Sequence, residues 1–211
     1  MNTNQWKLAE HIIGRNLFLT KGHLQTVKGA IRTLRGIDPR CVLRCDNQAL
    51  LGYYVKIISK LLTTVHEGVS DDGVSIEIVE GSSGDSFLDA INSQIDDIKL
   101  EQAVSLTDAS APRRFLIVNK AENLGSENEQ ALRYLLRDFP AINLACLYTT
   151  TLPAAEAIAM LQPAPAHYQL DIPGEETIVQ IRRAARNSRN GSSIAKLLDR
   201  IFGSDTEFQR G

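Results

Sequence analysis

Apolar residues recur along the chain with two alternating spacings, one typical of amphipathic helices and the other of buried strands. Over residues 21–35 they fall every three or four positions, which predicts a helix with one apolar face. The apolar run at residues 41–45 predicts a short buried strand. The helical spacing resumes over residues 48–65, so the predicted strand and helix are joined by a very tight turn.

This alternation of strand and helix continues toward the C-terminus. Ser126 and Glu129 form a capping-box signature that marks the start of one helix. Later strands are predicted at residues 74–79, 115–118, 142–148 and 167–172, and later helices at residues 87–98, 126–139, 153–161 and 175–189. Five strand–helix alternations predict an α/β fold with a doubly wound, mainly parallel five-stranded sheet.

The 211 residues divide into three segments around one α/β domain. Residues 1–20 form an N-terminal segment, residues 21–189 the α/β domain, and residues 190–211 a C-terminal amphipathic helix and tail. The apolar face of that last helix includes Leu198 and needs a surface to pack on. Either the domain itself or a partner supplies that surface.

The composition excludes several classes of protein. A hydrophobic content of 43% with a net charge of -2 argues against a disordered chain and against a strongly basic nucleic-acid binder. The first residues lack the apolar stretch of a secretory signal, and no segment has the roughly 18 consecutive apolar residues of a membrane span. We therefore expect a cytoplasmic protein without direct membrane insertion.

The three cysteines, Cys41, Cys45 and Cys146, all lie in predicted strands. Buried, reduced thiols are the expected state of such cysteines in a reducing compartment. Cys41 and Cys45 are not followed by a second Cys or His pair at zinc spacing, so we expect no metal site.

Residues 114–124 carry a family likeness. Their sequence, Arg-Phe-Leu-Ile-Val-Asn-Lys-Ala-Glu-Asn-Leu, resembles the Walker B strand of AAA+ ATPases, in which an apolar strand runs into Asp-Glu-Ala. The likeness extends over residues 17–189 and is nearest to the secretion- and transposition-associated ATPases, which have a Phe-containing entry like residues 16–19. The resemblance implies a P-loop NTPase-like fold, an AAA+ core without a full helical lid, and a strand order that reverses near the phosphate site.

The residues aligned with the Walker A loop depart from its pattern. The loop should read Gly-x-x-x-x-Gly-Lys-Ser/Thr, because glycines let the backbone wrap phosphates, the Lys reaches their oxygens and the hydroxyl holds Mg²⁺. The aligned residues here are Cys45, Leu50, Leu51 and Gly52. None of them can perform the corresponding role, so these positions line at most a vestigial pocket.

The Walker B acids are also replaced. The Mg²⁺-linked Asp aligns with Asn119 and the water-activating Glu with Lys120. Two acids, a formal charge of -2, become a neutral amide and a base, a charge of +1, where a divalent cation must be held. The predicted helix at residues 153–161 also lacks an arginine that could act as a finger. We expect no ATP hydrolysis, no cofactor and no enzymatic activity.

The remaining features favour protein contacts. The sequence predicts a regulatory or scaffold subunit whose contact residues include Trp6, Leu198 and Phe202. The resemblance suggests a partner that is an active ATPase or a membrane-associated assembly, such as a secretion or biosynthesis complex. The oligomeric state stays open.

Three alternatives stand beside the interpretation as a regulatory or scaffold subunit. Arg182, Arg183, Arg186 and Arg189 gather cations along one helix, which is compatible with a nucleic-acid-associated accessory protein resembling clamp-loader or transposition subunits. A divergent nucleotide-binding switch is the second alternative. The third, an enzyme of another class, lacks a nucleophile with a matching base, because the Ser-rich segment at residues 82–86 is not a nucleophile elbow.

Overall fold

The computed structural model describes the central part of the chain, with gaps. The residues that it describes are 19–36, 38–64, 74–81, 87–93, 96, 113–124, 127–128, 130–131, 134, 144–160, 166–186 and 191–202. Trp6, the capping-box pair Ser126 and Glu129, and Arg189 lie outside these residues, so the statements made about them stay predictions.

Five parallel strands form one sheet, in the order β2-β3-β4-β1-β5. This arrangement confirms the predicted doubly wound α/β fold. The chain order reverses beside β1, which lies between β4 and β5 rather than beside β2. The strands are β1 (Arg40–Arg44), β2 (Val74–Glu80), β3 (Arg113–Asn119), β4 (Leu144–Thr150) and β5 (Ala166–Gln169).

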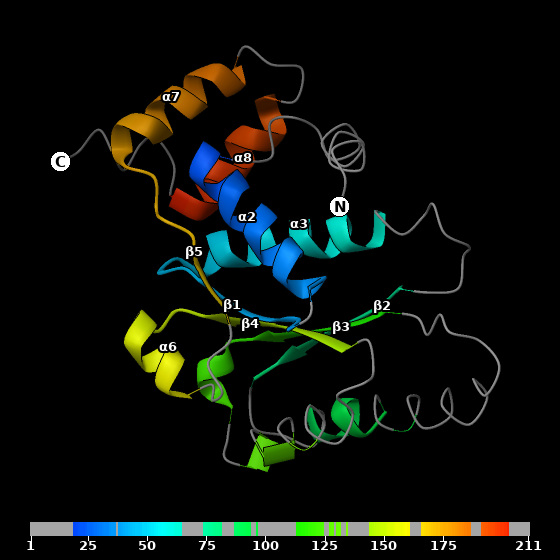
Figure 1. The fold of residues 1–211 in the computed structure, drawn as a ribbon. Coiled ribbons are helices and arrows are strands. Elements are labelled where there is room, and N and C mark those ends of the chain that lie inside the picture. Colours follow the sequence, from blue (N-terminus) through cyan, green and yellow to red (C-terminus); the bar gives the residue numbers. More distant parts are fainter. Residues whose placement is uncertain are drawn as a thin grey trace.

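Helices cover both faces of this sheet (Figure 1). One face carries α2 (Lys21–Leu34), α3 (Gln48–Thr64), α7 (Glu175–Arg186) and α8 (Gly191–Phe202). The other face carries α6 (Ala154–Met160) and the helical residues 87–93. None of the helices in the described ranges is long and apolar enough to cross a membrane.

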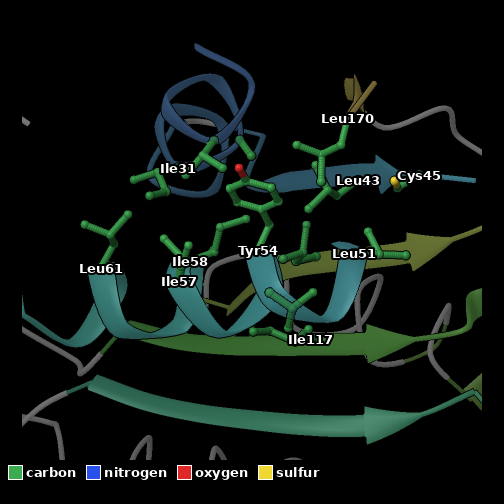
Figure 2. Packing of buried hydrophobic residues seen from close by; sticks show 14 of the residues in the cluster. Ile31, Leu43, Cys45, Leu51, Tyr54, Ile57, Ile58, Leu61, Ile117 and Leu170 are labelled. Atoms are coloured by element: carbon green, nitrogen blue, oxygen red, sulfur yellow. The ribbon is translucent and has the colours of Figure 1, made fainter. Parts of the chain in front are cut away.

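The core consists of two apolar clusters, one on each face of the sheet. Side chains alternate along a strand, so in β1 Cys41 and Leu43 join the α2–α3 cluster while Val42 joins the opposite one. All seven residues of β4 are buried, as expected of a central strand that helices cover on both faces. Figure 2 shows the α3 side of the larger cluster, where Tyr54, Ile58 and Leu61 line one face of the helix.

The α2 helix approaches the edge strand β5 closely. A Cβ atom on Gly29 would lie under 3.0 Å from the ring of Tyr168, so the glycine lets the helix sit on that ring. The Thr33 hydroxyl and the Tyr168 hydroxyl are 2.7 Å apart and share a hydrogen bond. This contact sets the position of α2 relative to the sheet.

The domain itself covers the apolar face of α8. Leu198 is fully buried and Ile201 nearly so, both within the α2–α3 cluster. The Asn47 side-chain amide donates a hydrogen bond of 3.1 Å to the Ile201 carbonyl and so joins the end of α8 to the start of α3. Leu198 is therefore a core residue, which corrects its assignment as a partner contact.

Candidate functional site

The carboxyl ends of β1, β3 and β4 form the candidate site. In open parallel sheets, ligands bind at this edge where the strand order reverses. Here that position lies between β1 and β4. The two strands end side by side, since Arg44 at the end of β1 pairs with Thr150 at the end of β4. The residues identified from the sequence as a vestigial pocket lie at the start of α3, at the end of β3, or directly after β1 or β3.

The turn between β1 and α3 contains three residues, 45–47, and is closed by hydrogen bonds within the chain. The Asn47 side-chain oxygen accepts from the Leu50 amide at 2.9 Å, which caps the start of α3. The Asn47 amide points at the Cys45 sulfur at 3.4 Å, and the Cys45 amide donates to the Thr150 carbonyl at 3.2 Å. These amides are used internally, whereas a phosphate-binding loop presents its amides to the ligand.

Three of the four aligned Walker A positions are packed in the core. Cys45, Leu50 and Leu51 are at most 1% exposed and belong to the α2–α3 cluster. Figure 2 shows Cys45 and Leu51 among the packed side chains of this cluster. Burial raises the pKa of the Cys45 thiol. Gly52 lies on α3, where an added Cβ would meet nothing within 4 Å.

Arg44 fastens the turn to the end of β4. Its Nε donates to the Leu152 carbonyl at 2.5 Å, and its guanidinium forms an ion pair with Asp46. The Leu152 amide in turn donates to the Thr150 hydroxyl at 3.1 Å. The cation nearest the switch point is thus engaged by groups of the same chain.

Asn119 and Lys120 contact an acid on the neighbouring strand. Asn119 Nδ2 donates to Glu80 Oε1 at 3.3 Å, and Lys120 Nζ lies 3.4 Å from Glu80 Oε2. The Thr149 hydroxyl donates to Asn119 Oδ1 at 3.2 Å and accepts from the Lys120 amide at 3.3 Å. The two replaced Walker B positions therefore form one polar network with the ends of β2 and β4.

Lys120 has a left-handed backbone conformation, with φ of 51°. Gly81 explains how the chain passes this point: a Cβ there would lie under 3.0 Å from the Lys120 carbonyl oxygen. The Gly81 amide donates to the Asn119 carbonyl at 2.6 Å, extending the β2–β3 pairing by one residue. The backbone at the end of β3 is thus fixed by the close approach of a glycine.

A carboxylate at this edge was missed by the sequence reasoning. Glu122 lies in the 3₁₀ turn at Ala121–Asn123, and its Oε1 accepts from the Thr151 hydroxyl at 3.1 Å. Its Oε2 is buried and has no hydrogen-bond partner in the described part of the chain. The family alignment drew attention to positions 119 and 120 alone, although Glu122 follows two residues later. Glu80, at the end of β2, and Glu122, just after β3, are thus two acids at this edge of the sheet.

Within the described ranges, no group of three or more His, Cys, Asp or Glu side chains is arranged to hold a metal ion. The acids at the carboxyl edge are engaged differently: Glu80 pairs with Lys120, and Glu122 accepts from Thr151.

Arg182, one of the arginines of α7, is buried rather than exposed. Arg182 is 6% exposed, and its guanidinium lies 3.3 Å from the Asp199 carboxylate on α8. Arg183 is exposed on the same helix. The Arg182 side chain therefore joins α7 to α8. It is not exposed for contact with a nucleic acid, as the run of arginines in the sequence had suggested.

The exposed apolar residues differ from the contact residues expected from the sequence. Phe202 is partly buried and packs against the α2–α3 cluster. Ile172, in the connection before α7, is 46% exposed, and Val179 on α7 is 44% exposed. Neither residue could be identified from the sequence, because the spacing of apolar residues does not show which of them stay in solvent.

Comparison with known proteins agrees with this architecture. No family model and no curated protein matches the chain. Among solved structures, the chain is similar to the Aeropyrum pernix ORC2 protein in ADPNP–ADP complexes, with a TM-score of 0.51 and 9% identity over 78% of this chain and 51% of that chain. The fold is AAA+-like.

Two further solved structures are similar at lower TM-scores. Caenorhabditis elegans PCH-2 gives 0.48 at 12% identity over 88% of this chain and 47% of that one. A Thermotoga maritima protein related to the DNA polymerase III gamma subunit gives 0.49 at 11% identity over 84% and 55%. This chain spans about half the length of all three proteins. Identities this low describe the fold alone.

Proposed function

We propose that this chain is an ATPase-like domain that does not hydrolyse nucleotide and acts as a regulatory or scaffold subunit through protein contacts. Its assembly would be of the kind that AAA+-like domains serve, such as a secretion or biosynthesis complex. The observation that carries the proposal is the closed three-residue turn between β1 and α3.

That turn removes the means of holding phosphates. A P-loop wraps several free backbone amides around the β- and γ-phosphates and adds a lysine. Here the turn has only three residues. The Asn47 side chain accepts a hydrogen bond from the Leu50 amide and donates one to the Ile201 carbonyl at the end of α8. The residue at the lysine position, Leu51, is 1% exposed and packs in the core. The Cys45, Asn47 and Leu50 amides are used within the chain, and Leu51 offers no charge to an anion.

The end of β3 supports the same proposal. Magnesium needs carboxylate or water ligands in near-octahedral geometry. Asn119 contributes an amide, and the Lys120 ammonium group neutralises Glu80 at 3.4 Å. Glu122 is the carboxylate that could substitute, but its Oε1 accepts from Thr151 and its Oε2, which has no partner among the described residues, is buried. Because that free oxygen is buried, we do not expect Glu122 to act as a water-activating base.

Protein contact is supported by the exposed apolar residues near α7. Ile172 and Val179 present apolar side chains beside the acidic first turn of α7, which contains Glu175 and Glu176. Single exposed apolar residues are common, so this feature supports a contact surface only together with the loss of the nucleotide-binding features. It also identifies the variants that test the proposal.

Magnesium-dependent phosphate release tests the inactive half of the proposal. We expect the wild-type protein to release phosphate from ATP no faster than a Glu122→Gln variant, which removes the remaining carboxylate charge beside Thr151. Asn119→Ala and Lys120→Ala should be equally inactive. Turnover in the wild type that Glu122→Gln abolishes would overturn the proposal and make Glu122 the catalytic base.

Quantitative affinity purification from the native cell tests the scaffold half. Wild type, Val179→Lys and Ile172→Lys proteins should fold alike, since both residues are exposed. We expect at least one protein partner to be retained by the wild type and lost from the lysine variants. Identical partner sets for all three proteins would reject this face as the contact surface.

A further inference from the structure

Charge is distributed unevenly over the fold. The α2 helix contains Lys21, Lys28 and Arg32 and no acid, and α3 contains Lys56 and Lys60 and no acid. These two helices carry a charge of +5 while the whole chain carries -2, so all other residues together carry -7. By contrast, α6, α7 and α8 each contain at least one Asp or Glu. A chain that is mildly acidic overall therefore contains one pair of purely basic helices.

The cations of α2 form a row on the side of the helix that faces away from the core. At about 100° per residue, Lys21, Lys28 and Arg32 lie within about 40° of one another around the helix axis. Lys21 and Arg32 are exposed, and Lys28 is partly exposed. At about 1.5 Å per residue the row is about 16 Å long. The buried residues of the helix lie on its opposite side: His23, Val27, Ala30, Ile31 and Leu34.

The α3 helix adds two more cations on the same face of the sheet (Figure 1). Lys56 and Lys60 are both exposed and lie four residues apart, about one helical turn. The large apolar residues that are exposed in the described part of the chain all lie on other segments. They are Ile78, Tyr134, Ile172 and Val179. The outward surface of the two helices is therefore cationic and lacks a large apolar anchor.

We propose that the row on α2 binds the phosphate backbone of a double-stranded nucleic acid without reading its sequence. A duplex carries one negative charge per about 1.7 Å of its axis, so the row runs beside about five base pairs. Each Lys or Arg that neutralises a phosphate releases a condensed counterion, and this release drives binding. The contact lies on α2 rather than on the arginines of α7, where Arg182 is buried. It adds a second kind of partner to the proposed scaffold and does not rest on the absence of hydrolysis.

The composition of this surface favours a duplex over other anionic partners. Protein interfaces are depleted in lysine and rely on aromatic or apolar anchors, whereas α2 and α3 present four lysines and no such anchor. A helix that lies in a membrane surface buries its apolar face in lipid, but the apolar face of α2 lies in the core. Single strands stack on aromatic rings, but Tyr53 and Tyr54 of α3 pack in the larger apolar cluster.

Fluorescence anisotropy with labelled duplexes of about 20 base pairs, one of DNA and one of RNA, tests the proposal. The wild type should bind at least one of them with a dissociation constant of about 1–100 μM near physiological salt. Three to five phosphate contacts predict a slope of about -3 to -4.5 for the logarithm of the association constant against the logarithm of salt concentration. Lys21→Gln/Arg32→Gln should make that slope shallower by about 2 and weaken binding at least tenfold.

A matched double variant separates the row from net charge. Arg183→Gln/Arg200→Gln removes the same charge from exposed positions of α7 and α8, and it should keep the wild-type slope. All four substituted residues are exposed, so we expect both variants to fold, which their urea unfolding midpoints check. Equal losses of affinity in the two double variants would overturn the proposal, and so would the absence of duplex binding by the wild type at about 50 mM salt.

Two further probes test the other anionic partners. Vesicles containing about 30% phosphatidylserine should not retain the protein at physiological salt. Retention that Lys21→Gln/Arg32→Gln abolishes, without duplex binding, would make the row a membrane contact and refute the proposal. Poly-glutamate at the same concentration of charge should not displace the duplex. Complete displacement would show that the row binds acidic chains in general, against a preference for closely spaced phosphates.

Discussion

Asn47 holds together the turn that stands in place of a phosphate-binding loop, so its replacement is the sharpest stability test. Its side-chain oxygen caps α3 at 2.9 Å from the Leu50 amide, and its side-chain nitrogen reaches the Ile201 carbonyl at 3.1 Å. Loss of a helix cap costs about 1 kcal/mol. Loss of a tertiary hydrogen bond costs about 1 kcal/mol more. We therefore expect Asn47→Ala to lower the free energy of unfolding by about 2 kcal/mol.

Asn47→Ser separates the two contributions. Serine is as good a helix cap as asparagine, but it is too short to reach the Ile201 carbonyl. It should cost about 1 kcal/mol, half the effect of the alanine variant. Urea unfolding followed by circular dichroism measures both variants against the wild type. If Asn47→Ala changes the unfolding free energy by less than about 0.5 kcal/mol, the turn is not held as we describe.

Three further predictions use the same unfolding assay. Gly29→Ala should destabilise the protein by about 1–3 kcal/mol, because the added methyl overlaps the Tyr168 ring, and an unchanged midpoint would contradict that packing. Leu198→Ala should lower the free energy of unfolding by about 2–5 kcal/mol and Val179→Ala by less than about 0.5 kcal/mol, since Leu198 is buried and Val179 is exposed. Equal effects of the two variants would contradict the packing of α8 on the core. Because the folded-state pKa of His23 lies below 6.5, the unfolded chain binds the proton more readily, so stability should fall as the pH drops below about 6.5, and His23→Gln should remove part of that fall.

The sheet could be predicted because each strand carries a local signal. The apolar run at residues 41–45 differs from β1 by one residue at each end, and the run at residues 74–79 differs from β2 by one residue. Turn residues and helical spacing separate these runs, so the alternation that defines an α/β fold is visible in the sequence. The fully apolar run at residues 115–118 is typical of a central strand of a parallel sheet, and β3 lies between β2 and β4.

The site could be predicted only in part, because its decisive contacts join residues far apart in the chain. Asn47 reads as an ordinary turn residue, and nothing local connects it with Ile201, 154 positions later. From the sequence, Arg182 is expected on a solvated basic face, whereas in the structure its buried guanidinium pairs with the exposed Asp199 carboxylate on the next helix. The apolar spacing of α8 predicted that Leu198 packs on some surface, but not whether the domain or a partner supplies it.

The hydrogen bonds of the buried His23 illustrate a second limit. His23 lies on the apolar side of a helix, where a histidine is most often a packed residue, and the sequence offers no partner for it. Its partners come from α3 and from a connection 148 residues away.

Isothermal titration of the purified protein with ATP, with and without Mg²⁺, tests the central claim most directly. The closed β1–α3 turn, the buried Leu51 and the Lys120–Glu80 pair predict no heat of binding at nucleotide concentrations up to about 1 mM. A dissociation constant below about 100 μM that weakens in Lys120→Ala would contradict the account and make this domain a nucleotide-binding switch.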